Sequence, residues 1–435
     1  MSRFSVGAML KENIMDGRPS RMKSYSDYEG LVIPPCGDFT PHTSITTRSP
    51  WMPVDHGSHA SRRSSLHEEL SQFMDYMAPT REEKALREDL VARITKLIQK
   101  LAPGATVCPV GSYITKLYFP TSDIDMVISF NQLYPSDAKT ELQLLEYKIR
   151  RSGFAGSIDS VLQASTPLLR VTDATTGLEV DLTADDGHGR RATNVVSSWL
   201  RRDESGVIRS LVTVLKMFLS IRRLGTTFTG GINSYVLVWM VAAYVKLGAP
   251  ERVSQGSNDV GDIISRMSSL HVGGRTSATA SAQPAQAPKE SAPALDLGDA
   301  LLGFLRFYGR DFDYATKVIQ FSTDNVRITS KPLSPGFSVG RYRTFSSTTQ
   351  QYLLHITDPA CPTTDMGCKA YGIKHARETF RDAHDALVEL LGSTKTRVGR
   401  ARTTDRGLLG NFMGGDFSNF VAERRRIAMS WKGRH

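Results

Sequence analysis

The chain has 435 residues, of which 40% are apolar and 8% aromatic, and its formal net charge is +10. This composition supports folded domains and excludes a wholly disordered chain. The four cysteines form no Cys-x-x-Cys pair and have no paired His nearby, which argues against a structural zinc site and a disulfide framework. The most apolar stretch, residues 235–245, is too short to cross a bilayer, so we expect a soluble, intracellular protein without a membrane partner.

The positive charge is concentrated towards the C-terminal end. Residues 395–435 hold ten Lys or Arg and three Asp or Glu, whereas the six basic and six acidic residues of 1–60 cancel. A basic segment behind a nearly neutral body favours a polyanionic partner that is reached by a flexible arm. The alternative is a solvated tail that only aids solubility.

The N-terminal half is expected to hold a disordered segment, helices and short strands. Residues 1–65 are rich in Ser, Arg, Pro and Gly and are predicted to be disordered. Residues 81–101 have a helical period of apolar side chains, with Thr80 as the cap and acidic residues in the first turn. A second helix is predicted at 138–152 and ends at Gly153, and β-like segments lie at 106–110, 124–130 and 178–182. These elements predict an α+β lobe.

From residue 210 onward the pattern turns helical. Apolar side chains form one stripe at 211–219, and residues 235–245 are apolar all round, as in a buried helix. Residues 276–294 are mostly Ser, Ala, Gln and Pro, so a disordered insertion is predicted over about 254–295. Helical periodicity resumes at 297–308 and at 374–391.

Three acidic residues lie on or directly before predicted strands and suggest a metal site. Asp123 and Asp125 are two positions apart, so on a strand both carboxylates point to the same face. Carboxylates at that spacing repel each other unless a cation or a proton lies between them. Asp181 stands between Val180 and Leu182 on another β-like segment. Three carboxylates can hold two Mg²⁺ ions, or Mn²⁺, whose remaining ligands are phosphate oxygens of a nucleotide.

Gly111 and Ser112 precede the acids and suit a triphosphate. Glycine lets backbone N–H groups approach phosphate oxygens closely, and the serine hydroxyl adds a donor. A Gly-Ser pair alone carries no information, but the order Gly111-Ser112, Asp123-x-Asp125 and a distant strand Asp is specific. A helix cap or turn at Asp123 is the alternative, and the β-like residues 126–128 disfavour it.

With these motifs the chain resembles the DNA polymerase β-type nucleotidyltransferases and, among them, the Trf-type noncanonical poly(A) polymerases. The resemblance runs from about residue 79 to about 391 and includes Thr229-Gly-Gly-Ile-Asn-Ser-Tyr235, Leu297-Gly-Asp299, Phe304-Leu-Arg-Phe-Tyr-Gly309, Asp358-Pro359 and Tyr371-Gly372. It implies a nucleotidyltransferase lobe with a small mixed sheet, a helical central domain, and a cleft between them. The implied boundaries are 86–205 for the catalytic domain, 66–85 with 206–390 for the helical PAP-associated domain, and 391–435 for the basic tail.

The resemblance also implies nucleotide contacts. By position, Lys216 and Ser234 would contact phosphates and Tyr235 would stack on the base. The alternatives are that Lys216 extends to the surface and that Tyr235 is part of a buried helix. His188 stands where the family usually has Asn, before Gly189, and both are expected near the sugar. A polar residue near Asp365 reads the base edge in the family, and a carboxylate there can accept from the adenine amino group, a donor that uracil lacks.

The function implied is template-independent transfer of AMP from ATP to RNA 3′ ends by a two-metal mechanism. The resemblance further implies nuclear, including nucleolar, RNA surveillance and decay in a TRAMP-like complex with a zinc-knuckle RNA-binding protein and an RNA helicase. One alternative is a terminal uridylyltransferase. The other is an inert scaffold, whose sign would be a lost acid, and all three acids are present.

Overall fold

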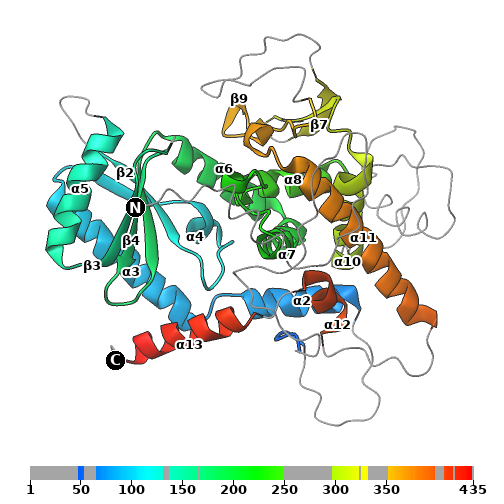
Figure 1. The fold of residues 1–435 in the computed structure, drawn as a ribbon, viewed down its shortest axis with the longest axis horizontal. Coiled ribbons are helices and arrows are strands. Elements are labelled where there is room, and N and C mark those ends of the chain that lie inside the picture. Colours follow the sequence, from blue (N-terminus) through cyan, green and yellow to red (C-terminus); the bar gives the residue numbers. More distant parts are fainter. Residues whose placement is uncertain are drawn as a thin grey trace, which may run out of the picture.

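The structure, a computed structural model, describes residues 48–52, 65–130, 137–164, 166–248, 296–322, 325–331, 351–396, 406–414 and 417–433. A sheet lobe and a helical lobe lie side by side, and each has its own apolar core (Figure 1). Most of the predicted disorder at 1–65 and the whole predicted insertion at 254–295 fall outside the described residues. Within the described ranges, no helix is long and apolar enough to span a membrane.

The sheet lobe is built on a five-stranded mixed sheet with the spatial order β1-β2-β5-β4-β3. Strand β2 runs parallel to β5, and the other neighbours are antiparallel. The strands are β1 (Thr106–Pro109), β2 (Ile124–Ser129), β3 (Ala155–Val161), β4 (Leu168–Asp173) and β5 (Glu179–Ala184). Helices α3 (Arg81–Leu101) and α5 (Ala138–Ser152) pack their apolar faces against it, and α4 (Gly111–Thr115) adds Tyr113 to the same core. Helix α6 (His188–Arg202) follows β5 and buries Val196, Trp199 and Leu200 in the helical-lobe core.

The helices of this lobe are those that local sequence signals predict. Thr80 caps α3 and forms a capping box with Glu83, and α5 ends at Gly153 with φ +72°. The predictions of both helices are confirmed. Strands β3 and β4 were not predicted. The sequence of β3, Ala-Gly-Ser-Ile-Asp-Ser-Val, is that of an edge strand without a continuous apolar run.

The helical lobe is formed by helices that come from both ends of the chain. They are α2 (Leu66–Met77), α7 (Val207–Ile221), α8 (Ser234–Lys246), α10 (Leu297–Arg306) with its π-helical extension η2 (Phe307–Asp311), α11 (Ile373–Thr396), α12 (Gly407–Met413) and α13 (Ser418–Lys432). Two small antiparallel sheets lie beside them, β6 (Lys317–Phe321) with β7 (Val326–Ser330), and β8 (Thr357–Asp358) with β9 (Cys361–Asp365). Together the two lobes confirm the predicted α+β fold class.

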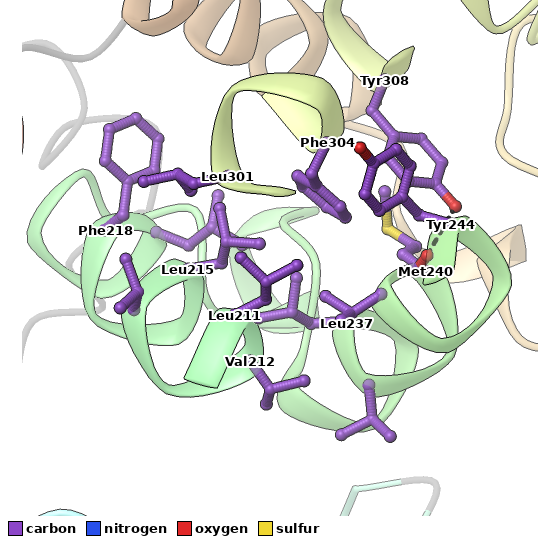
Figure 2. Packing of buried hydrophobic residues seen from close by; sticks show 14 of the residues in the cluster. Leu211, Val212, Leu215, Phe218, Leu237, Met240, Tyr244, Leu301, Phe304 and Tyr308 are labelled. Carbon is purple, nitrogen blue, oxygen red and sulfur yellow. Dashed lines mark hydrogen bonds between the residues drawn. The ribbon is translucent and has the colours of Figure 1, made fainter. Parts of the chain in front are cut away.

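Leucines and aromatic rings of α7, α8 and α10 interlock in the centre of the helical lobe (Figure 2). Phe304 and Tyr308 lie against α8, and the Tyr308 hydroxyl donates to the Met240 carbonyl at 2.8 Å. Residues 236–244 of α8 are all buried, as the uniformly apolar sequence predicts. Each such leucine or phenylalanine contributes about 1.5–3 kcal/mol through burial.

The prediction of a flexible basic arm at 391–435 is wrong for its described C-terminal part. Phe412, Phe417 and Phe420 lie in the helical-lobe core, and Ile427 lies in the sheet-lobe core. Figure 1 shows α13 below the sheet lobe, where it meets the lower end of α3. The net charge of the segment did not predict this packing, because it does not register a few apolar side chains that recur at helical spacing.

Two arginines of α13 are engaged in the fold. Arg424 pairs with the buried Glu83 at 3.1 Å and donates to the Tyr76 carbonyl at 2.6 Å. Arg426 pairs with Glu423 of the same helix and donates to the Thr176 carbonyl of the sheet lobe. These two arginines therefore stabilise the position of α13 and are poorly placed to bind a polyanion.

Residues 48–52 are an exception to the predicted N-terminal disorder. The Trp51 ring is buried edge-on against Phe73 and Phe417, with ring centres 5.0 and 4.9 Å away. The Ser49 hydroxyl donates to the Arg406 carbonyl at 2.7 Å. This short stretch is ordered because an aromatic pocket between α2 and α13 receives its tryptophan.

Candidate active site

The sheet places the three predicted acids together. Asp125 on β2 is the register partner of Asp181 on β5, so the two side chains share one face of neighbouring strands. Asp123 precedes β2 by one residue. The charges of Asp123 and Asp181 both act on Asp125. Sequence spacing predicted the Asp123–Asp125 pair, and the parallel β2–β5 pairing adds the third carboxylate.

Burial and mutual repulsion make ionisation of the acids unfavourable. Burial, followed by the charges of Asp123 and Asp181, raises the pKa of Asp125 to about 7. Burial and Asp181 likewise raise the pKa of Asp123. A carboxylate whose pKa is raised in this way is stabilised either by a proton or by a cation. The donor set, which consists only of carboxylate oxygens, suits Mg²⁺ or Mn²⁺.

An arginine of the neighbouring strand forms a salt bridge with the third acid, Asp181. Arg170 on β4 is the register partner of Asp181, and its Nε and Nη2 donate to both carboxylate oxygens at 2.9 Å. Its Nη2 also lies 4.0 Å from Asp123. With Asp181 turned to Arg170, no three His, Cys, Asp or Glu side chains in the described part of the chain are gathered to hold a metal ion. The charge and the carboxylate donors of the site therefore fit a divalent cation. Asp181 would become a ligand of that cation by giving up its hydrogen bonds to the Arg170 guanidinium.

Glycine is required at position 111 by the backbone conformation and by the neighbouring Asp125. Gly111 has φ +65°, and a Cβ there would lie 2.6 Å from Oδ2 of Asp125. Its own N–H donates to Thr193 Oγ1 of α6 at 2.9 Å, and the predicted contacts of Gly111 and Ser112 to a triphosphate stay predictions. Thr193 was not predicted. Ser112 follows as a half-buried residue in the first turn of α4.

Lys216 on α7 is half-buried, and the charges of Asp123 and Asp125 act on its ammonium group. Its Nζ donates to the Leu117 carbonyl at 3.0 Å and lies 4.6 Å from the centre of the Phe119 ring. Burial lowers its pKa to about 8, and the charges of Asp123 and Asp125 oppose that shift. The ammonium is thus the cationic group of the helical lobe that acts on the acids.

A buried carboxylate of the Asp358-Pro359 block, to which the sequence assigned no role, joins two predicted nucleotide residues. Asp358 of β8 is 1% exposed and accepts from the Tyr235 hydroxyl at 2.7 Å and the Ala360 N–H at 2.8 Å. His188 Nε2 lies 2.6 Å from its other oxygen. The only sequence signal was an Asp-Pro pair directly after a short apolar run. His188 thus binds a carboxylate across the lobes, where an Asn would offer only an uncharged amide.

The other predicted nucleotide residues lie around this cluster. Tyr235 packs edge-on against Trp239 and His188, with ring centres 6.0 and 6.1 Å away. Ser234 opens α8 directly after its cap Asn233. Gly189 lies in the first turn of α6, where a Cβ would come within 3.3 Å of Val127 Cγ1. Their contacts to a nucleotide stay predictions.

We expect the His188–Asp358 pair to make stability depend on pH. The hydrogen bond to Asp358 raises the pKa of His188 above its ordinary value. The stabilisation is therefore complete below about pH 6.5, the unfolded value, and is lost as the pH rises through the raised pKa. Because the imidazole is 38% exposed, the gain is small, below about 1 kcal/mol. Melting curves should show the gap between wild type and His188→Gln shrinking towards pH 8.

A matched variant separates the charge effect from the hydrogen bond. Asp358→Asn keeps the shape of the acceptor but removes its charge, so the same pH dependence should flatten. A gap between wild type and His188→Gln that widens with rising pH would show that the imidazole is held neutral.

Asp365 is less available for base reading than the sequence suggested. It is buried, and its Oδ1 accepts from the N–H groups of Ile356 at 3.2 Å and Gly367 at 2.8 Å. Burial raises its pKa. This oxygen stabilises the loop that follows β9, so a contact to adenine would have to come from the other oxygen.

A separate cavity of about 260 Å³ lies in the helical lobe. Its lining includes Arg310, Tyr314, Tyr352 and Lys374, and it holds none of the predicted site residues. The acids therefore do not belong to this cavity.

Comparison with known proteins connects this geometry to a family. Residues 66–201 match the family model "Poly(A) RNA polymerase, mitochondrial-like, central palm domain", and residues 296–364 match "Cid1 family poly A polymerase". A solved structure of the polymerase core of TRAMP, a RNA surveillance complex, has a TM-score of 0.63 at 22% identity. The match covers 84% of this chain and 98% of that one, which supports the two-lobed fold.

Curated relatives extend the comparison. The poly(A) RNA polymerase cid14 of Schizosaccharomyces pombe is 26% identical over 335 residues, which cover 77% of this chain and 42% of the relative. The inactive noncanonical poly(A) RNA polymerase protein Trf4-2 of Drosophila melanogaster is also 26% identical, over 80% of this chain and 75% of the relative. The chain spans about half the length, or less, of the first curated relatives it matches. The two domain matches and these similarities confirm the predicted resemblance: the chain is similar to the poly(A) RNA polymerases of the Trf and Cid14 type.

Proposed function

We propose that the protein transfers AMP from ATP to the 3′-hydroxyl of RNA without a template. One observation carries the proposal: Asp125 and Asp181 lie in register on adjacent strands, Asp123 stands two residues before Asp125, and the charge of Lys216 from the other lobe acts on Asp123 and Asp125. Such a site suits the developing charge of a phosphoryl transfer.

Each residue has a role that follows from its place. Asp123, Asp125 and Asp181 would hold the divalent cations, Mg²⁺ or Mn²⁺, which supply charge neutralisation at the reacting phosphate and lower the pKa of the attacking hydroxyl. Lys216 would bind a phosphate of ATP. The Tyr235 ring would support the base, and Asp358 orients that ring through its hydroxyl. The pair of His188 and Asp358 would hold α6 and β8 at the nucleotide.

The partners and the location are proposed on likeness alone. The similarity to the TRAMP polymerase core supports RNA 3′ ends as substrate and a complex with a zinc-knuckle RNA-binding protein and an RNA helicase, in the nucleus or nucleolus. The structure adds one argument for a partner. Arg424 and Arg426 are engaged in the fold, so these two arginines would contribute little to RNA affinity, which favours a contribution from a separate subunit.

Extension of a short oligo(A) RNA with each of the four nucleoside triphosphates tests the proposal. Wild-type protein with Mg²⁺ should lengthen the RNA with ATP at least about tenfold faster than with UTP, a difference of about 1.4 kcal/mol in transition-state binding. A preference for UTP would instead support a terminal uridylyltransferase. No extension with any nucleotide, with Mg²⁺ or with Mn²⁺, would support an inert scaffold.

The scaffold is the second candidate because one relative is named inactive. The sequence and the fold count against it here. All three acids are present, and the sheet register brings Asp125 and Asp181 together. A protein that only docks partners would have no need to keep buried carboxylates beside one another, since their repulsion destabilises the fold.

A further inference from the structure

The short connection between α4 and β2 is shared by the two lobes. We call residues 115–120 the seam segment. Leu117 and Phe119 are buried in the helical-lobe core, whereas Tyr118, between them, is buried in the sheet-lobe core. The alternation is that of an extended chain with one lobe on each side. The segment begins at the last residue of α4 and ends three residues before Asp123.

Three cationic side chains hold the seam segment by its main-chain carbonyls. Arg209 Nη1 donates to Thr115 O at 2.9 Å and to Lys116 O at 3.2 Å. Lys216 Nζ donates to Leu117 O at 3.0 Å. Arg87 Nη2 donates to Pro120 O at 3.0 Å and, more weakly, to Phe119 O at 3.4 Å. Nearly every carbonyl of the segment therefore receives a cation-assisted hydrogen bond.

The cations come from both lobes. Arg209 and Lys216 lie on α7 of the helical lobe, and Arg87 lies on α3 of the sheet lobe. The contacts on one side fix the start of the segment to the helical lobe, and those on the other side fix its end to the sheet lobe. Since Asp123 follows the seam segment, the position of its carboxylate relative to Lys216 depends on these hydrogen bonds.

Arg87 is a costly residue for a purely structural contact. Its side chain is fully buried, its Nε and Nη1 have no hydrogen-bond partner among the described residues, and the Tyr118 ring lies 4.8 Å from the guanidinium. Carbonyls and a ring offset the burial of a charge less well than a directly paired carboxylate would. The charges of Glu83 and Glu423 act on Arg87, and that of Asp123 acts on it as well. The cost is explained if Arg87 serves the acid at the end of the segment.

We propose that Arg87 and Arg209 are positioning residues that hold the seam segment and thereby set Asp123 for binding the divalent cation. The inference rests on the proposed function for the identity of the site. Neither arginine donates to a carboxylate of the site in the structure. Each acts through its hydrogen bonds to the main chain of the seam segment, which leads to Asp123.

Cation binding to the full chain without RNA tests the proposal directly. Mn²⁺ is titrated into wild type, Arg87→Met, Arg87→Lys and Arg209→Met, and the free ion is followed by electron paramagnetic resonance. The matched control is Arg93→Met, which removes another arginine of α3, the one that binds the buried Asp173 through two hydrogen bonds on the same lobe. Unfolding midpoints are measured on the same samples, and the Mg²⁺ concentration for half-maximal AMP transfer is the second readout.

The expected result is a loss of Mn²⁺ affinity of roughly 10- to 100-fold in Arg87→Met and Arg209→Met, the range found when residues that orient metal ligands are changed. Arg87→Lys keeps a cation and one donor and should recover most of the affinity. Arg93→Met should lower the unfolding midpoint and leave the affinity unchanged. Half-buried Arg209 keeps the test valid if Arg87→Met does not fold.

The proposal is overturned if both methionine variants bind Mn²⁺ as wild type does, or if Arg93→Met weakens binding equally. Failure of the proposed function gives a different result. Wild type would then bind Mn²⁺ but transfer no AMP, and the comparison among the arginine variants would remain informative.

Discussion

Replacing Asp125 with asparagine is expected to reduce AMP transfer by at least about 1,000-fold. The carboxylate is the central one of the three, since the charges of both Asp123 and Asp181 act on it. Loss of one shared ligand removes several kcal/mol of charge stabilisation from the transition state, and each 1.36 kcal/mol corresponds to tenfold in rate. The measurement is single-turnover extension of oligo(A) RNA with ATP and Mg²⁺.

The same variant should fold at least as well as wild type. In the wild type the pKa of Asp125 is raised to about 7, so its ionised form is disfavoured in the folded state near neutral pH. A neutral amide of the same shape removes the repulsion by Asp123 and Asp181. In metal-free buffer at pH 7.5 the melting temperature should stay equal or rise. The control Asp75→Asn, on the exposed face of α2, should change neither activity nor melting temperature. Retained tailing in Asp125→Asn would refute the three-acid site.

Replacing Phe417 with alanine is expected to destabilise the protein by about 3–5 kcal/mol. The ring is 1% exposed and packs against Trp51, Phe73 and Phe420, so alanine leaves a cavity where residues 48–52, α2 and α13 meet. Urea unfolding followed by tryptophan fluorescence gives the change in the free energy of unfolding. The control Val421→Ala, an exposed residue of α13, should cost less than about 0.5 kcal/mol.

This result would decide between two views of the basic C-terminal segment. A segment that serves as a mobile arm for RNA would tolerate Phe417→Ala with unchanged stability and would lose activity mainly as salt is raised. A packed segment loses stability at every salt concentration. The buried Arg222, which donates to the Phe412 and Met413 carbonyls at 3.0 and 3.2 Å, supports the second view.

Local patterns in the sequence predicted those elements whose signals lie within one segment. The capping box at Thr80 and Glu83, the terminating Gly153 and the uniformly apolar α8 are such signals, and all three helices appear where they were expected. The spacing of Asp123 and Asp125 also predicts a shared strand face. Only the alternation of two residues is needed for that conclusion.

The remaining features depend on contacts between segments that no local pattern encodes. Arg170 meets Asp181 because β4 and β5 pair in one register, and Asp358 meets His188 across 170 positions of the chain. The packing of α13 was missed for a related reason. A net charge describes the whole segment, whereas burial depends on the few apolar side chains that face the two lobes.

Helix α13 contributes Phe420 to one apolar core and Ile427 to the other, less than two turns apart on a single rod. If either lobe unfolds, α13 loses its packing on that lobe and its contact with the other lobe is weakened as well. Two bodies that could each have been an independent folding unit are thereby joined into one cooperative transition. A substitution near the end of the chain can thus be felt as a loss of order at the distant carboxylates, although it touches none of them.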